Sequence, residues 1–147
     1  MGEIVIDMDT LNNMRMFEQI TRIKPIDCIS DETRIVFVVP AKKLSQAIGK
    51  NAANVKKIRE IVKKNVDIIE FSDDPEKFVR NIFYRFHVNR VEFVNTEKGL
   101  TVYVYVRPDE KGRAIGRSGS NLRMAERILQ RHYEVSEVYI ATSSMKD

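Results

Sequence analysis

The sequence has 147 residues, 43% of them hydrophobic, and its 25 Lys and Arg residues against 21 Asp and Glu residues give a net charge of +4. This mixed composition excludes a disordered tail, while the length allows one ordinary domain or two small ones. Apolar runs such as Ile35 to Val39 are far shorter than the ~20 residues of a membrane span, and the N-terminus does not resemble a secretory signal. The single cysteine cannot form an internal disulfide, so we expect a cytoplasmic protein without membrane contact.

The first half of the chain predicts a helix, two strands, two more helices and a last strand. Apolar residues recur every three positions in the first helix, which we expect Asp9 or Thr10 to cap. Two strands are expected at 26–30 and 34–39, and a final strand at 66–71. Between them lie a short helix, a glycine loop and a longer helix. The short helix carries Leu44, Ala47 and Ile48, and the residues of the longer helix that are predicted to face inward are Val55, Ile58, Ile61 and Val62.

The second half predicts the same order of elements. Asp74 and Pro75 fit the N-cap and first position of a helix whose apolar stripe runs on to Phe86. A short helix, a glycine loop and a longer helix again follow two strands. In the second of those strands, three valines should share one face while Tyr103 and Tyr105 share the other. The strands of this half are expected at 91–96, 101–107 and 135–141.

Two ten-residue segments indicate that the halves are copies of one unit. Residues 47–56 read A-I-G-K-N-A-A-N-V-K and residues 114–123 read A-I-G-R-S-G-S-N-L-R, at an offset of 67. The apolar strand before each segment aligns at the same offset. We therefore predict an α+β fold with the order αββααβ twice, in domains 1–72 and 73–147. The join from Ser72 to Pro75 is short, so we expect the two units to pack against each other.

The glycine loops are suited to holding a sugar-phosphate chain. In the second unit, Gly116 to Gly119 would present backbone N–H groups, an arginine and a hydroxyl, and the next helix begins there with its positive dipole end. The first loop, Gly49 to Ala52, has alanine in place of the second glycine, and a methyl group there restricts φ. We expect the first loop to bind more weakly or with different geometry.

A helix, the sequence Ile-Gly-x-x-Gly and a second helix, set within the order αββααβ, resemble a KH domain of the prokaryotic topology. Such domains use the loop to hold about four nucleotides of single-stranded RNA. Two units with A-I-G-K and A-I-G-R at matching places resemble the NusA family of transcription factors, in the short archaeal form made of the KH pair alone. The resemblance covers nearly the whole chain. It implies single-stranded RNA binding in transcription elongation, termination or antitermination, with RNA polymerase as a candidate partner.

The expected RNA site consists of the two loops and the helix ends beside them. Apolar residues would floor a groove beneath the bases, the loops would hold the backbone, and Lys and Arg would neutralise phosphates. Asn54 and Asn121 recur two residues beyond each loop, where an amide fits either RNA contact or loop support. The predicted contact residues are Ala47, Ile48, Gly49, Lys50, Asn51, Ala52, Asn54 and Lys56 in the first unit, and Ala114, Ile115, Gly116, Arg117, Ser118, Gly119, Asn121 and Arg123 in the second.

The net charge divides unevenly along the chain. Residues 42–64 carry +7 and residues 111–131 carry +5, which leaves −8 on the rest. The basic residues therefore gather around the two loops, as phosphate binding requires. The rest of the chain, which is acidic, would repel RNA that approaches away from the loops, and it is suited to contact with a protein partner.

The sequence does not indicate an enzyme. The chain has no nucleotide-binding or catalytic motif, and Asp73-Asp74 and Asp109-Glu110 fall at helix starts, where capping explains them. Two histidines and one cysteine are too few for a zinc site, so we expect no bound metal. We also expect that the protein is a monomer, is not an enzyme and needs no cofactor. Two alternatives stay open: a KH pair acting in ribosome assembly or RNA processing, and a protein-interaction module docking through its tyrosine-bearing strands or acidic surface.

Overall fold

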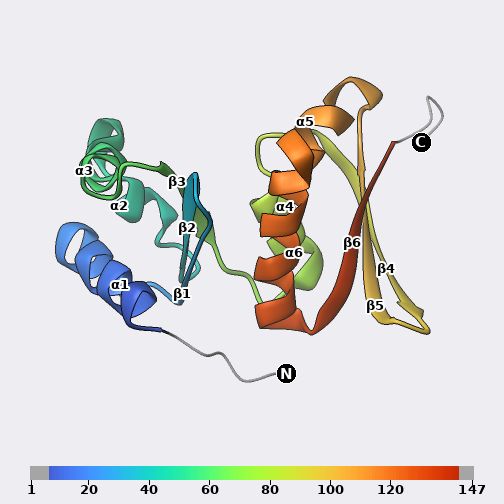
Figure 1. Cartoon of the computed structure of the whole chain (residues 1–147), viewed down its shortest axis with the longest axis horizontal. Helices are drawn as coiled ribbons and strands as arrows, with labels where there is room; N and C mark the ends of the chain where they lie inside the picture. The colour runs from blue at the N-terminus through green and yellow to red at the C-terminus, as the bar shows by residue number, and fades with distance from the viewer. Residues whose placement is uncertain (1–6, 143–147) are drawn as a thin grey trace. The chain divides into compact units, whose positions relative to one another are not determined.

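The computed structural model of the protein describes residues 7–142, which form two compact units with the boundary between Asp73 and Asp74. Each unit contains a helix, two strands, a short helix, a longer helix and a strand, and each has one three-stranded sheet (Figure 1). The predicted α+β class and the repeated αββααβ order are confirmed. Among the described residues, no helix combines the length and apolar character needed to cross a bilayer.

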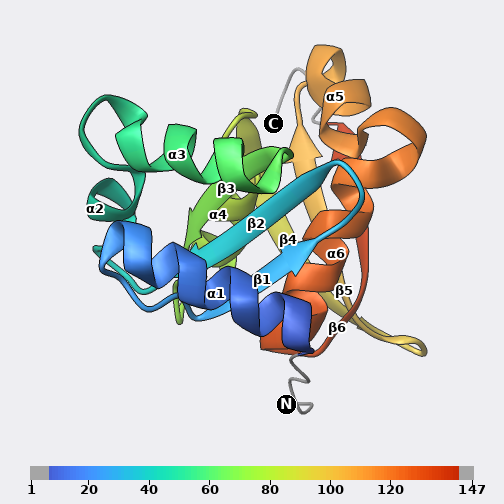
Figure 2. The same cartoon turned by 60° about the vertical axis from the view of Figure 1, so that its left-hand side comes forward.

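In the first unit the strand order is β1-β2-β3, with β1 antiparallel and β3 parallel to the central strand. Figure 2 shows α1 and α3 alongside the strands of this sheet. The core joins the two layers: Phe17 of α1 stacks on Phe37 of β2, with ring centroids 4.4 Å apart, and Ile58 of α3 is buried with them. The elements are α1 (Met8–Thr21), β1 (Asp27–Ser30), β2 (Arg34–Val39), α2 (Leu44–Ile48), η1 (Lys50–Ala52), α3 (Ala53–Val62) and β3 (Asn65–Glu70).

Two details of the first unit correct the predictions. The N-cap of α1 is Asp7, whose carboxylate accepts a hydrogen bond of 2.8 Å from the Thr10 backbone N–H, so the helix begins before the predicted cap at Asp9 or Thr10. Ile61 is 54% exposed rather than inward-facing. It lies at the margin of the apolar stripe of α3, whose centre is the buried Ile58.

In the second unit the strand order is β4-β5-β6, again with one antiparallel and one parallel pair. Figure 1 shows α4 and α6 along one face of this sheet. Val102, Val104 and Val106 are fully buried, and Tyr103 and Tyr105 lie on the opposite face, as predicted. The elements are α4 (Pro75–Ile82), β4 (Val88–Thr96), β5 (Gly99–Val106), η2 (Pro108–Glu110), α5 (Lys111–Ile115), η3 (Arg117–Gly119), α6 (Ser120–Tyr133) and β6 (Val135–Thr142).

Helix α4 begins as predicted but ends sooner. Asp74 is its N-cap, with the carboxylate accepting from the Glu76 N–H, and Pro75 is its first residue. The helix ends at Ile82, whereas the predicted stripe continued to Phe86. The chain leaves the helix through a tight turn in which the Phe86 N–H donates to the Phe83 carbonyl at 3.0 Å. The apolar residues therefore keep their helical spacing beyond the last residue of the helix.

Candidate nucleic-acid interface

The two glycine loops have the same backbone conformation. Gly49 has φ 82° and ψ 165°, and Gly116 has φ 82° and ψ 169°. At the fourth loop position, Ala52 has φ 60° and ψ 29°, while Gly119 has φ 75° and ψ 14°. Both values lie in the left-handed region. The alanine of the first loop thus adopts the conformation that glycine adopts in the second, despite its methyl group.

The first glycine of each loop is required by a close approach as well as by its dihedral angles. A Cβ on Gly116 would lie 2.8 Å from the backbone nitrogen of Asn121, and a Cβ on Gly49 would lie 2.9 Å from the Asn54 Nδ2 atom. Their combination of φ and ψ belongs to a region that is essentially restricted to glycine. Only glycine therefore allows the short helix to turn so sharply into the longer one.

We expect Ala52→Gly to stabilise the first unit by up to about 1 kcal/mol. A left-handed conformation costs an L-residue about 1–2 kcal/mol, and the greater freedom of glycine in the unfolded chain offsets part of that gain. Native-state hydrogen exchange of the α3 amides would measure the change. The matched control is Ala53→Gly, one residue on, where φ is −59° and ψ is −40°. That change should destabilise by about 0.5–1 kcal/mol, and similar effects at both positions would contradict the assigned strain.

The recurring asparagines hold the helix-loop-helix together. In the first unit, Asn54 Nδ2 donates to the carbonyls of Ala47 and Gln46 at 3.1 and 3.2 Å. In the second, Asn121 Nδ2 donates to the Ala114 carbonyl at 2.7 Å. Carbonyls at a helix C-terminus lack partners within the helix, and these amides supply them. Of the two roles predicted for the asparagines, these contacts favour support of the loop. We call the bonds from each asparagine amide to the preceding short helix an asparagine clamp.

The predicted contacts from Ala47 and Ala114 are wrong. Both residues are 0% exposed, because they occupy the inner side of the short helices α2 and α5. Neither can lie beneath a base. The neighbouring Ile48 and Ile115 are half-buried and still offer an apolar surface beside the loops.

Exposed cationic and polar side chains surround both loops. The exposed predicted residues are Lys50, Asn51, Lys56, Arg117, Ser118 and Arg123. The half-buried ones are Ile48, Gly49, Ala52, Asn54, Ile115, Gly116, Gly119 and Asn121. The N-cap positions of α3 and α6 provide no side-chain hydrogen bond to the first turn. Each long helix therefore begins at its loop without a capping side chain on its N–H groups, which is a favourable arrangement for an anion.

The second loop has one contact that the first lacks. Arg123 Nη1 donates to the Ser118 carbonyl, and a Cβ on Gly119 would lie 3.0 Å from that same nitrogen. The missing side chain of Gly119 thus leaves room for the guanidinium at the loop. In the first unit the corresponding residues are Ala52 and Lys56, and no bond from this lysine to its loop occurs within the described chain.

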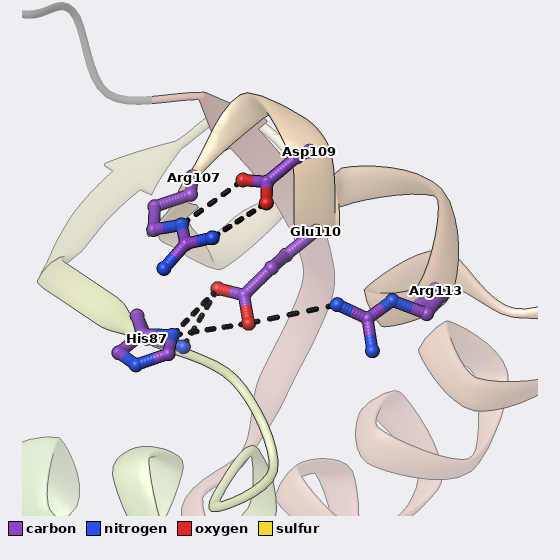
Figure 3. Close-up of polar contacts among 5 residues, drawn as sticks. All are labelled: His87, Arg107, Asp109, Glu110 and Arg113. Carbon is purple, nitrogen blue, oxygen red and sulfur yellow. Dashed lines mark hydrogen bonds and ion pairs between the residues drawn. The ribbon is translucent and has the colours of Figure 1, made fainter.

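A buried carboxylate near the second loop was not predicted (Figure 3). Glu110 accepts from the His87 backbone N–H at 2.9 Å, lies 3.1 Å from His87 Nδ1, and lies 3.8 Å from an Arg113 guanidinium nitrogen. The His87 backbone hydrogen bond is the main cause that lowers the pKa of Glu110. The contact ties the start of α5 to the segment before β4, so it positions the short helix that leads into the loop.

The same region corrects the capping prediction for the Asp109-Glu110 pair. Neither side chain caps α5, since the Asp109 carboxylate accepts a hydrogen bond of 3.0 Å from Arg107 Nε and Glu110 turns inward. The matching position in the first unit is Lys43, which is exposed. The internal repeat therefore gave no signal for a buried carboxylate here. Within residues 7–142, no cluster of three or more His, Cys, Asp and Glu is placed to hold a metal ion.

Comparison with known proteins places this geometry in a family. Residues 75–143 match the family model of the NusA-like second KH domain. A probable transcription termination protein NusA from Thermoplasma acidophilum is 31% identical over 140 residues, which are 95% of this chain and 97% of that protein. One from Methanocaldococcus jannaschii is 31% identical over 99% of this chain and 80% of its own length. The crystal structure of APE1850 has a TM-score of 0.78 and 31% identity, covering 92% of this chain and 99% of that one.

Proposed function

The chain belongs to the family of short archaeal NusA-like proteins with tandem KH domains, and from this membership we propose that it binds single-stranded RNA through both glycine loops. The observation that carries the proposal is the duplicated loop. Both copies share left-handed backbone geometry, an uncapped helix start and exposed cations, although their side chains differ. Two divergent copies would keep such a costly conformation for a shared ligand more readily than for packing alone.

Phosphate binding follows from the atoms that surround each loop. In the second unit, the first N–H groups of α6 attract an oxyanion at the loop, where Arg117 and Ser118 are exposed. Arg123, bonded to the Ser118 carbonyl, adds a positioned guanidinium. Ile115 lies beside the loop as an apolar surface for a base or sugar. In the first unit, Lys50 and Lys56 would supply the corresponding charges.

An RNA strand long enough to reach both loops would be bound more strongly than by either loop alone. Each KH unit holds about four nucleotides, so one RNA strand that reaches both loops is retained when either contact opens. We propose that the first loop contributes less than the second, because Lys56 is not held against it. The proposed action is binding, without chemistry on the RNA.

Affinity for single-stranded RNA should fall as salt rises. The loops offer four cations for phosphates, Lys50, Lys56, Arg117 and Arg123, so log K against log salt concentration should have a slope near −0.7 × 4, or about −3. Fluorescence anisotropy with a labelled RNA oligonucleotide, measured across a salt series, would give the slope. A slope near zero would contradict the electrostatic part of the site, and affinity weaker than ~1 mM for every RNA tested would favour a protein-interaction module instead.

We further propose that the RNA contact operates during transcription elongation, termination or antitermination, with RNA polymerase as partner. The relatives named above support the transcription role. Crosslinking of bound RNA in cells would test it. Crosslinks on nascent transcripts near their 3′ ends would support action at the polymerase, whereas enrichment of ribosomal precursors would assign the KH pair to ribosome assembly or RNA processing.

A further inference from the structure

The outward face of the second sheet is aromatic, charged and separate from the glycine loops. The sheet register places Arg90 beside Tyr105, and it places Glu92, Tyr103 and Tyr139 in one row across the three strands. We define the tyrosine face by the residues that lie on this side of the sheet and make its polar and ring contacts: Arg90, Glu92, Tyr103, Tyr105, Glu137 and Tyr139.

One half of the tyrosine face already holds a guanidinium. The Arg90 Cζ atom lies 4.2 Å from the centroid of the Tyr105 ring, within cation–π distance. The Tyr105 hydroxyl donates to Glu92 Oε1, and that same oxygen lies 3.9 Å from an Arg90 nitrogen. A ring and a carboxylate joined by the tyrosine hydroxyl thus form a seat for arginine, with the ring beneath the cation and the carboxylate at its edge.

The other half of the face repeats the ring and the carboxylate. The Tyr139 hydroxyl donates to Glu137 Oε2 at 2.6 Å, and the ring stacks on Tyr103 with centroids 5.4 Å apart. Tyr139 is 43% exposed. The hydrogen bond from Tyr139 is the main cause that lowers the pKa of Glu137, so this carboxylate stays charged at neutral pH. Within the described chain, no guanidinium lies over the Tyr103–Tyr139 pair.

A lysine is the present neighbour of that carboxylate. Lys98 Nζ lies 3.6 Å from Glu137 Oε1, but its side chain is 72% exposed. A solvent-exposed ion pair between a lysine and a carboxylate contributes little to stability, because water competes for both charges and the long lysine side chain loses rotamer freedom. An incoming guanidinium can use the ring and both carboxylate oxygens together, which an ammonium on a flexible stem does less well.

We propose that Tyr103, Glu137 and Tyr139 form a docking site for an arginine side chain on a protein partner. The Arg90 seat on the same face is the structural precedent, and tyrosine and arginine are the residue types that dominate protein–protein hot spots. Nucleic acid fits the face less well. Two of its tyrosine hydroxyls are bonded to carboxylates, which would face the phosphates of a strand stacked on the rings.

The test is an NMR titration of the full chain with two short probes of equal length. The first is an acetylated, amidated peptide with the sequence Gly-Arg-Gly-Arg-Gly, and the second carries lysine in place of arginine. We expect the arginine peptide to shift the ring resonances of Tyr103 and Tyr139 and to bind at least ~3-fold more tightly than the lysine peptide. Glu137→Gln and Tyr139→Leu should each weaken arginine-peptide binding at least ~5-fold.

Controls separate this site from the RNA loops. Glu137→Gln should leave RNA affinity unchanged, and its spectrum will show whether the sheet is intact. The loop variant Arg117→Asp with Ser118→Asp should leave peptide binding unchanged. Equal binding of the two peptides, absence of tyrosine shifts at millimolar peptide, or unaltered binding by both face variants would each overturn the proposal. Equivalent shifts caused by a single-stranded RNA octamer would assign the face to RNA instead.

Discussion

Replacing Arg117 and Ser118 together with aspartate should lower the affinity for single-stranded RNA about 100-fold or more. At ~4 Å in water, two unit charges interact by about 1 kcal/mol. Arg117→Asp removes one attraction and adds one repulsion, and Ser118→Asp adds another repulsion, which together approach ~3 kcal/mol, or roughly 100-fold. Both side chains are exposed, and aspartate tolerates the left-handed conformation of residue 118, so the fold should persist. Anisotropy at fixed salt would measure the loss.

Two comparisons make the result specific to the second loop. Lys24→Asp also makes the protein more acidic but lies on the chain after α1, outside both loop segments, and should weaken binding less than ~3-fold. Lys50→Asp with Asn51→Asp changes the first loop at the matching positions, and we expect a smaller loss than in the second. A larger loss there would reverse the ranking of the loops, while unchanged affinity in the Arg117 and Ser118 variant would remove the second loop from the site.

Gly116→Ala should destabilise the second unit by about 3 kcal/mol and weaken RNA binding with it. The added Cβ would lie 2.8 Å from both the Asn121 backbone nitrogen and its Cβ, and φ of 82° is unfavourable for alanine. Strain of this kind costs about 1–3 kcal/mol before the clash is counted. The chain has no tryptophan, and its five tyrosines all lie between residues 84 and 139, in the second unit. The near-ultraviolet circular dichroism of tyrosine, followed during urea unfolding, therefore reports on the second unit alone.

The matched control lies four residues earlier in the same helix-loop-helix. Gly112 is inside α5, and a Cβ there would meet nothing within 4 Å. Gly112→Ala should therefore stabilise the second unit by about 0.5–1 kcal/mol, because alanine favours the helix. If the two alanine variants behave alike, the close approach of Asn121 does not determine the loop.

The order of elements was predictable because it depends on local periodicity and on a repeat that can be aligned. Helical and strand spacings, the Asp74–Pro75 start and the glycine pair at the loop all act over a few residues. The left-handed alanine was not predictable in this way. Propensity disfavours Ala52 in that conformation, and the packing of α2 against α3 overrides it.

The features of the site that the sequence did not predict depend on contacts between residues that are far apart in the sequence. A five-residue helix has too few apolar positions to show that Ala47 and Ala114 face inward. The carboxylate of Glu110 meets His87 across 23 residues of chain, where no spacing rule applies. The asparagines recur in the sequence at the same offset, but only the three-dimensional structure shows that their amides donate to carbonyls seven residues back.

The asparagine clamps hold both loops in shape in the chain without RNA. The conformational entropy of the loops is therefore lost during folding rather than at RNA binding. RNA then meets a rigid template, and the encounter rate should depend on charge and salt rather than on a slow loop rearrangement. Warming should act differently at each loop. Arg123 bonds to the second loop, whereas Lys56 makes no corresponding bond to the first loop within the described chain. The two halves of the RNA site would then open at different temperatures, each below the melting of its own sheet.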